Sequence, residues 1–141
     1  MKTRSLLSAI AFGIGIFLTT PAARAQTISV SAFPSVITNE ADVSTITFTV
    51  FPPAPRILKI NYALTGTAAL GADYALIGSF TSSGQVVIPA GQVTATITLQ
   101  TFYDEDPFHH EFVTLTLLHG KGYKVGSPSR ARIDIENQPK I

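Results

Sequence analysis

The sequence contains no cysteine and no tryptophan, and charged residues make up only 13% of its 141 residues. Without cysteine there is no disulfide bond, and no residue to which a bacterial lipoprotein would attach its lipid. The absence of tryptophan argues against a sugar-binding platform, for which Phe102, Tyr103 and Phe108 are the remaining aromatic candidates. A chain of this length forms one domain, stabilised by core burial alone or by core burial and a bound ion.

A concentrated positive charge is also missing. The formal net charge is +1, from ten basic and nine acidic residues. Three of the basic residues, Lys2, Arg4 and Arg24, lie in an N-terminal segment that we expect to be removed, which leaves seven basic against nine acidic residues. The remaining chain has no basic excess to hold a phosphate backbone, so we predict that it does not bind nucleic acid.

Residues 1–25 have the pattern of a cleavable signal peptide. A short positive start precedes an almost entirely apolar run at residues 6–18, and residues 23–25 (Ala-Arg-Ala) form a small-x-small cleavage site. The apolar run is shorter than the roughly 20 residues that a membrane-spanning helix needs. We expect export to the periplasm or the extracellular space, with residues 26–141 as the mature domain and no membrane span after cleavage. An uncleaved anchor is the alternative.

Alternation of apolar and polar residues dominates the rest of the chain. The clearest runs lie at residues 45–50, 58–62, 93–99, 113–117 and 131–135, and weaker ones at 28–32 and 86–88. Such alternation is typical of strands with one buried and one solvated face. No segment of the mature chain has helical spacing, and glycine and proline separate the runs. We predict an all-β fold, an immunoglobulin-like antiparallel β-sandwich of about seven strands, with residues 28–32 at an edge and Val93 facing inward.

The few carboxylates narrow the candidate sites. Glu111 shares the alternation phase of the apolar residues after it, so its carboxylate should point inward at the rim, where it needs a partner. Its neighbours His109 and His110 are weak partners at neutral pH, so a bound metal ion would satisfy it. Asn137 shares the inward phase of the last strand, whereas Asp134 should face solvent. Oxygen ligands gathered at one rim suit Ca²⁺, which takes six to eight of them.

A series of short motifs resembles the signature of Calx-β domains. Residues 60–62 (Ile-Asn-Tyr), 66–68 (Gly-Thr-Ala) and 71–74 (Gly-Ala-Asp-Tyr) are similar to the V-x-Y, G-T-A and G-x-D-Y elements of that family. Residues 88–91 (Ile-Pro-Ala-Gly) resemble its I/F-P-A-G-E step, and residues 111–117 its E-x-F-x-V-x-L strand. The resemblance implies an immunoglobulin-like sandwich that often binds Ca²⁺ at one end.

The resemblance covers residues 28–137 and also implies a set of calcium ligands. Matched position by position, the acidic ligand positions of the family fall on Glu40, Asp73, Asp104 and Glu111. Asn137 stands where the family often has an aspartate and offers an uncharged oxygen, while Phe108 replaces a glutamate and cannot bind a metal. We therefore expect a single Calx-β-like module that binds Ca²⁺ weakly and acts in adhesion or interaction with a protein or cell-surface partner.

Other interpretations of the same residues remain open. Each proposed ligand also has a purely structural interpretation. Asp73 could cap a turn without binding an ion, Glu40 could simply flank a strand, and Asp104 could be part of a solvated acidic loop. The protein would then be a purely structural or interaction sandwich with a decayed ion site. An enzyme inhibitor is a further alternative.

Transition-metal binding and catalysis are disfavoured. His109 and His110 are adjacent on a predicted strand and so face opposite sides, and His119 is the only other histidine. The sequence has no nucleophile elbow, phosphate-binding loop or metalloprotease helix. We therefore predict that the protein is not an enzyme.

Overall fold

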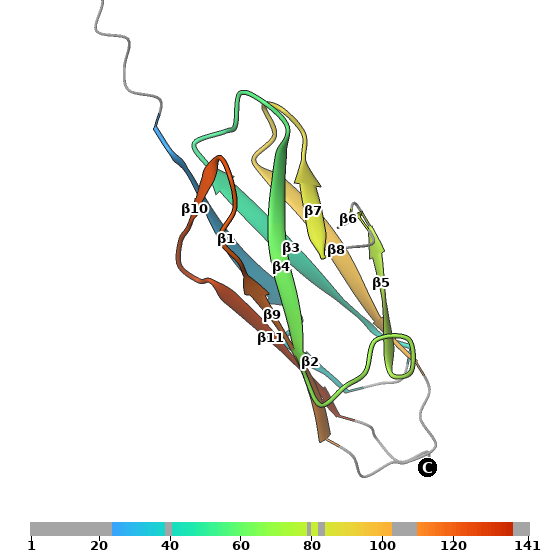
Figure 1. Ribbon diagram of the computed structural model, residues 1–141. Coiled ribbons are helices and arrows are strands. Elements are labelled where there is room, and N and C mark those ends of the chain that lie inside the picture. Colours follow the sequence, from blue (N-terminus) through green and yellow to red (C-terminus); the bar gives the residue numbers. More distant parts are fainter. Residues whose placement is uncertain (1–23, 39–40, 79, 82–83, 103–109, 137–141) are drawn as a thin grey trace, which may run out of the picture.

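The computed structural model describes residues 24–38, 41–78, 80–81, 84–102 and 110–136 (Figure 1). In these residues there are strands but no helix, and none of them belongs to a helix long and apolar enough to cross a membrane. The strands are β1 (Gln26–Phe33), β2 (Val36–Ile37), β3 (Val43–Phe51), β4 (Leu58–Gly66), β5 (Tyr74–Gly78), β6 (Phe80–Thr81), β7 (Gln85–Ile88), β8 (Thr94–Thr101), β9 (His110–Leu117), β10 (Tyr123–Val125) and β11 (Arg130–Glu136). The all-β fold is confirmed.

The strands form two sheets that pack face to face. One sheet has the order β10-β1-β3-β8-β5, and the other has the order β2-β11-β9-β4-β7-β6. The division of β1, β3, β8 and β5 from β4, β9 and β11 is that of an immunoglobulin-type sandwich. Most pairs are antiparallel, but β1 with β10 and β11 with β2 are short parallel pairs.

All seven predicted runs lie in strands, with two corrections. The run at 28–32 is not at an edge, because β1 pairs with β3 on one side and with β10 on the other. Val93 does not face inward: it is 45% exposed, because the turn closed by the Gln92 N–H and the Pro89 carbonyl, 3.1 Å apart, delays β8 to Thr94.

Four strands, β2, β5, β6 and β10, are additional to the prediction. The longest of them, β5, reads Tyr-Ala-Leu-Ile-Gly, which is continuously apolar up to its final glycine and shows no alternation. The other three have only two or three residues each, too few to show a period. Alternation therefore identifies the half-buried strands and overlooks the short ones.

The core lies between the sheets and consists of the inward-facing residues of the long strands. Side chains with no exposed surface are Ile28, Ile46, Phe48, Ile60, Val86, Ile88, Ile97 and Leu99. Phe48 of β3 and Tyr62 of β4 meet across the two sheets with ring centroids 5.8 Å apart. Each such large side chain stabilises the fold by about 1.5–3 kcal/mol relative to exposure.

Candidate functional site

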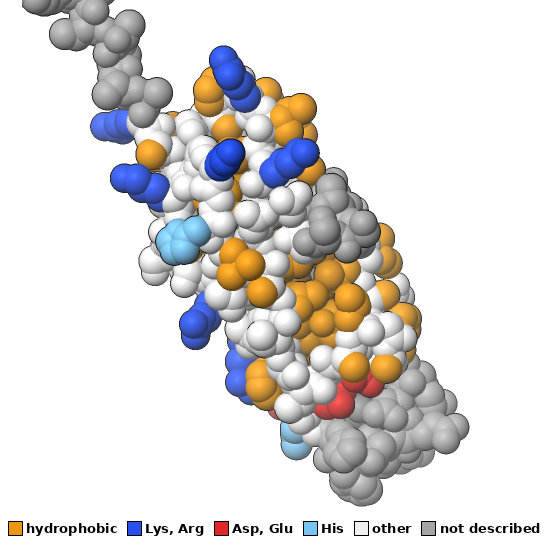
Figure 2. Space-filling view, viewed as in Figure 1, with side chains coloured by type: hydrophobic (Ala, Val, Ile, Leu, Met, Phe, Trp, Pro, Cys, Tyr) orange, Lys and Arg blue, Asp and Glu red, His pale blue; other side chains and the backbone are white. Residues whose placement is uncertain are grey.

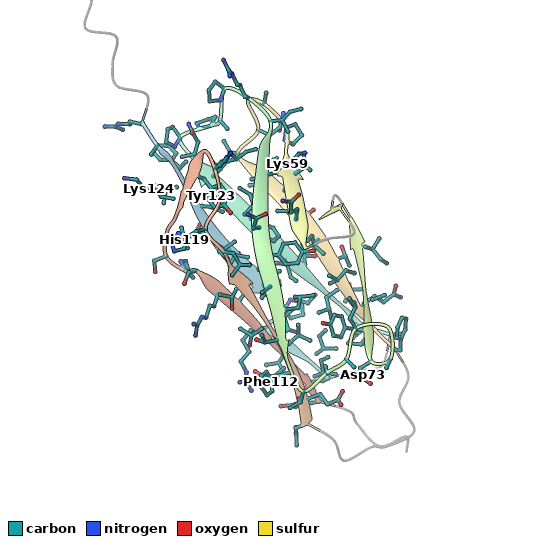
Figure 3. All side chains as sticks on the ribbon, viewed as in Figure 1. Lys59, Asp73, Phe112, His119, Tyr123 and Lys124 are labelled. Atoms are coloured by element: carbon teal, nitrogen blue, oxygen red, sulfur yellow. The ribbon has the colours of Figure 1, made fainter. Side chains whose placement is uncertain are left out.

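The carboxylates of the described residues gather at one end of the sandwich, which we call the acidic end. They belong to Asp42 before β3, Asp73 before β5, Glu111 at the start of β9, and Asp134 and Glu136 at the end of β11. Figure 3 shows Asp73 and Phe112 at this end, and Figure 2 shows acidic side chains there on the visible face. The acidic end is where the sequence predicted an ion site.

The last residue of β8 and the residue after it hold Asp42 and Asp73 at this end. The backbone N–H and the hydroxyl of Thr101 both donate to the carbonyl of Asp42, each at 3.1 Å. The next N–H, that of Phe102, donates to the carbonyl of Asp73 at 2.8 Å. Since Thr101 is only 2% exposed, these bonds are shielded from water. The segment before β3, the β4–β5 connection and the end of β8 therefore meet here.

Asp73 also closes the turn that leads into β5. Its Oδ2 atom accepts the N–H of Ala69 at 2.6 Å, and its own N–H donates to the Ala69 carbonyl at 2.9 Å. Among the described residues, the Asp73 carboxylate makes no other hydrogen bond, which leaves Oδ1 able to accept a cation. Asp73 thus caps a turn, as the alternative interpretation expected, and can still serve as a ligand.

The buried tyrosine after Asp73 responds to this charge. Tyr74 is 2% exposed, and burial raises the pKa of its hydroxyl. The negative charges of Asp73 and of ionised Tyr62 raise this pKa further. Burial likewise raises the pKa of Tyr62. Both tyrosines therefore remain neutral in the folded domain at physiological pH and take no part as charged ligands.

Glu111 is brought to the same end by contacts between the β4–β5 connection and β9. The Phe112 N–H donates to the Thr67 hydroxyl at 3.1 Å, and the Ala68 N–H donates to the Phe112 carbonyl at 3.2 Å. The approach is so close that a β-carbon on Gly66 would lie 2.0 Å from the Phe112 carbonyl oxygen. Only glycine fits there, so the start of β9 is held against the beginning of the β4–β5 connection, which continues into the turn of Asp73.

The sequence argument from the charge of Glu111 is wrong in one respect. Glu111 is half-buried in the phase of Val113 and Leu115, as predicted, but it already has an interaction partner in the structure. The lack of a partner is therefore no argument for a metal ion at Glu111. Its candidacy as a ligand depends on its position at the acidic end alone.

The other predicted residues divide into two groups. Glu40, Asp104 and Asn137 lie outside the described residues, as do Phe108 and His109. Asp134 faces outward as predicted, between buried Ile133 and Ile135, with Oδ1 2.7 Å from Nη2 of Arg132. Within the described ranges, no three His, Cys, Asp or Glu side chains are placed to hold a metal ion.

Asp42 is a candidate that the sequence interpretation overlooked. The bonds from Thr101 place it on one side of the end of β8, and the bond from Phe102 places Asp73 on the other, although 31 positions separate the two acids in the sequence. The spacing Glu40-Ala41-Asp42 could have drawn attention to it, because two acids at i and i+2 before a strand often lie on one side of the chain. Asp42 has an interaction partner in the structure.

The fold has counterparts among solved structures. The apo form of the Calx CBD1 domain matches with a TM-score of 0.59 and 17% identity, over 79% of this chain and 98% of that domain. CBD12 from CALX1.2 and the calcium-binding domain CBD12 of CALX1.1 each match with a TM-score of 0.57 and 17% identity, over 76% and 77% of this chain. The chain spans 43% and 44% of those two structures, less than half of their length.

No protein-family model matches the chain, and no curated protein matches it in sequence. The three structural matches are nevertheless of the kind that the short motifs indicated, and one of them fits almost end to end. The chain therefore has a Calx-β-like fold.

Proposed function

We propose that the protein is a Calx-β-like module that binds Ca²⁺ weakly at the acidic end. The observation that carries this proposal is the pair of backbone bonds from Thr101 and Phe102, which hold Asp42 and Asp73 on either side of the end of β8, at the same end of the sandwich. In the sequence, Glu40 precedes Asp42 by two positions, and Asp104 follows Phe102 by two. Two residues of chain span at most about 7 Å, and on this ground we include Glu40 and Asp104 in the proposed site.

The proposed ligands are oxygen atoms from separate segments of the chain. They come from Glu40, Asp73, Asp104, Glu111 and Asn137, and Asp42 joins them because of its position. Fewer charges lower calcium affinity, and the replacement of acids by Phe108 and Asn137 favours the weak range of about 10⁻⁴ to 10⁻³ M that is typical of extracellular modules. The name of the CBD12 match, a calcium-binding domain, supports the same chemistry.

Thermal unfolding with and without calcium tests the proposal. At about 1 mM Ca²⁺ an ion of this affinity adds roughly 0.4–1.4 kcal/mol to the free energy of unfolding. The midpoint should rise by a few degrees, and Mg²⁺ should raise it less because it gives up its water reluctantly. Calorimetric titration should show heat over the same concentration range.

Two matched substitutions locate the site. Asp73→Asn keeps an oxygen that can accept the Ala69 N–H but removes the charge, so it should abolish the calcium-dependent shift without unfolding the domain. Asp134→Asn removes the same charge on the outer face and should leave the shift intact. A wild-type protein without shift or heat up to about 10 mM Ca²⁺, well above this affinity range, would contradict calcium binding.

A purely structural or interaction sandwich is the second candidate function. It is favoured by the existing contacts of the acids: the Asp73 carboxylate accepts the Ala69 N–H, and Glu111 has a partner within the protein. Under this alternative the acidic end needs no ion, and Asp73→Asn changes stability equally with and without calcium.

Export completes the proposal. Removal of residues 1–25 would deliver the module to the periplasm or the extracellular space, where it acts by binding a protein or cell-surface partner rather than by catalysis. Mass spectrometry of the exported protein should then find Gln26, or its cyclised form, at the N-terminus. Membrane-bound protein that retains Met1 would show an uncleaved anchor instead.

A further inference from the structure

Basic side chains gather at the end opposite to the acidic end. Arg56, Lys59, Lys121 and Lys124 are all exposed, and we call the surface that they mark the basic end. Figure 3 shows Lys59 and Lys124 at the end away from Asp73, and Figure 2 shows most of the visible basic side chains there. None of the four forms an ion pair with another described residue. The formal charge near zero therefore conceals two oppositely charged ends.

The basic end is hollowed between the cations. Lys59 and Lys121, together with Asn61 and Gln85, line a shallow pocket of about 580 Å³. A second pocket of about 270 Å³ adjoins it and is lined by Arg56 and Lys121. Lys121 lines both, so three cations line two neighbouring hollows whose described lining includes amide side chains and no carboxylate.

A network of hydrogen bonds joins the two backbone segments that carry Lys59 and Lys121. The Tyr123 hydroxyl donates to the Leu118 carbonyl at 2.6 Å and accepts the N–H of Asn61 at 3.0 Å. The Leu118 N–H in turn donates to the Asn61 carbonyl at 2.9 Å. The loop that carries Lys121 is therefore tied to β4, which carries Lys59, so the backbone positions of the two lysines are fixed relative to each other.

Large apolar side chains stand among the cations. Phe51 is 67% exposed, Ile57 65% and Val93 45%. Phe51 ends β3, Ile57 lies in the β3–β4 connection, and Val93 lies in the β7–β8 connection at the same end. Prolines stiffen both connections, at positions 52, 53 and 55 and at position 89. Exposed apolar tips surrounded by basic side chains are typical of surfaces that lie at the boundary between lipid headgroups and acyl chains.

We propose that the basic end docks on an anionic lipid bilayer. Charge complementarity favours an anionic partner, because the described carboxylates all lie at the other end. The exposed Phe51 and Ile57 favour a bilayer over a soluble polyanion, which would offer them no apolar environment.

Sedimentation with vesicles tests the proposal on the protein purified in the form that cells produce. The readout is binding to vesicles of phosphatidylcholine and phosphatidylglycerol in equal parts, in excess of binding to phosphatidylcholine alone. Each basic side chain near an anionic surface contributes about fivefold in affinity, so Lys59→Gln with Lys121→Gln should weaken this excess about 30-fold. The matched control, Arg130→Gln with Arg132→Gln, removes the same charge from β11 and should leave the excess unchanged.

A second pair of variants tests the apolar part. Phe51→Ser with Ile57→Ser should weaken vesicle binding severalfold, whereas Phe33→Ser with Leu70→Ser, which removes exposed apolar side chains at the acidic end, should not. Binding should persist in EDTA, since the acidic end is not in contact with the lipid. This result is independent of whether calcium binds there, so the two proposals can fail separately.

Several outcomes would overturn the docking proposal. Equal binding to both kinds of vesicle, or an equal loss of binding in the control variants, would show that the basic end does not bind the lipid. Displacement by heparin with no effect of Phe51→Ser would show a soluble acidic polymer as the partner. Self-association in sedimentation without lipid, abolished by the lysine variants, would show the acidic end of a second copy instead.

Discussion

Replacement of Gly66 by alanine tests how the acidic end is assembled. Gly66 has φ of +138°, and a β-carbon there would lie 2.0 Å from the carbonyl oxygen and 2.9 Å from the carbonyl carbon of Phe112. The backbone of β4 would have to move away from β9, which also disturbs the bond from the Ala68 N–H to the Phe112 carbonyl. The backbone conformation costs an L residue about 1–2 kcal/mol, and the overlap with backbone atoms about 1–3 kcal/mol more.

Gly71→Ala provides the matched control. Gly71 also has positive φ, +90°, but a β-carbon there meets nothing within 4 Å, so only the conformational cost remains. Urea denaturation should therefore give a loss of unfolding free energy of about 2–5 kcal/mol for Gly66→Ala and about 1–2 kcal/mol for Gly71→Ala. Equal losses would refute the reasoning, because they would show that the close contact between β4 and β9 does not form.

Two further predictions concern tyrosines. Tyr123→Phe leaves the Asn61 N–H and the Leu118 carbonyl without the hydroxyl partner, so urea denaturation should show a loss of about 1–3 kcal/mol, and an unchanged midpoint would contradict the network. Because burial raises the pKa of Tyr62 and Tyr74 in the folded state, the unfolded chain loses these protons first. The free energy of unfolding should be insensitive to these groups below about pH 10 and fall above it, with a shallower fall in a Tyr74→Phe variant; a flat profile in alkaline urea titrations would be the contrary result.

The strands and their inward faces could be predicted from the sequence because burial imposes a period of two. In β9 the buried residues Val113, Leu115 and Leu117 alternate with threonines, and the same rule places Glu111 in the inward phase. The rule fails where a turn competes with the period, as at Val93, whose apolar side chain continues the pattern of β8 but which lies between the Pro89–Gln92 turn and the first residue of β8. Local turn bonds decide such boundaries, and periodicity does not report them.

The assembly of the acidic end could be predicted only in part. Motif matching selected Asp73 and Glu111, and the structure brings both to one end of the sandwich. It did not select Asp42, because the bonds that place Asp42 come from Thr101, a residue far along the chain whose buried hydroxyl has no sequence signal. Nor does spacing show that Asp73 and Glu111 have contacts within the protein, since those depend on the fold of the connecting loops.

The separation of charge into two ends follows from strand order. In a sandwich of mostly antiparallel strands, successive connections alternate between the ends, so the β3–β4 and β9–β10 connections carry Arg56 and Lys121 to one end while Asp42 and Asp73 lie at the other. The nine residues of β4 separate the ends by about 30 Å at roughly 3.4 Å per residue. This is several times the Debye length of about 8 Å at physiological ionic strength, so an ion at the acidic end barely changes the potential at the basic end. A module docked on lipid through the basic end would hold its acidic end away from the membrane, open to calcium and to a partner.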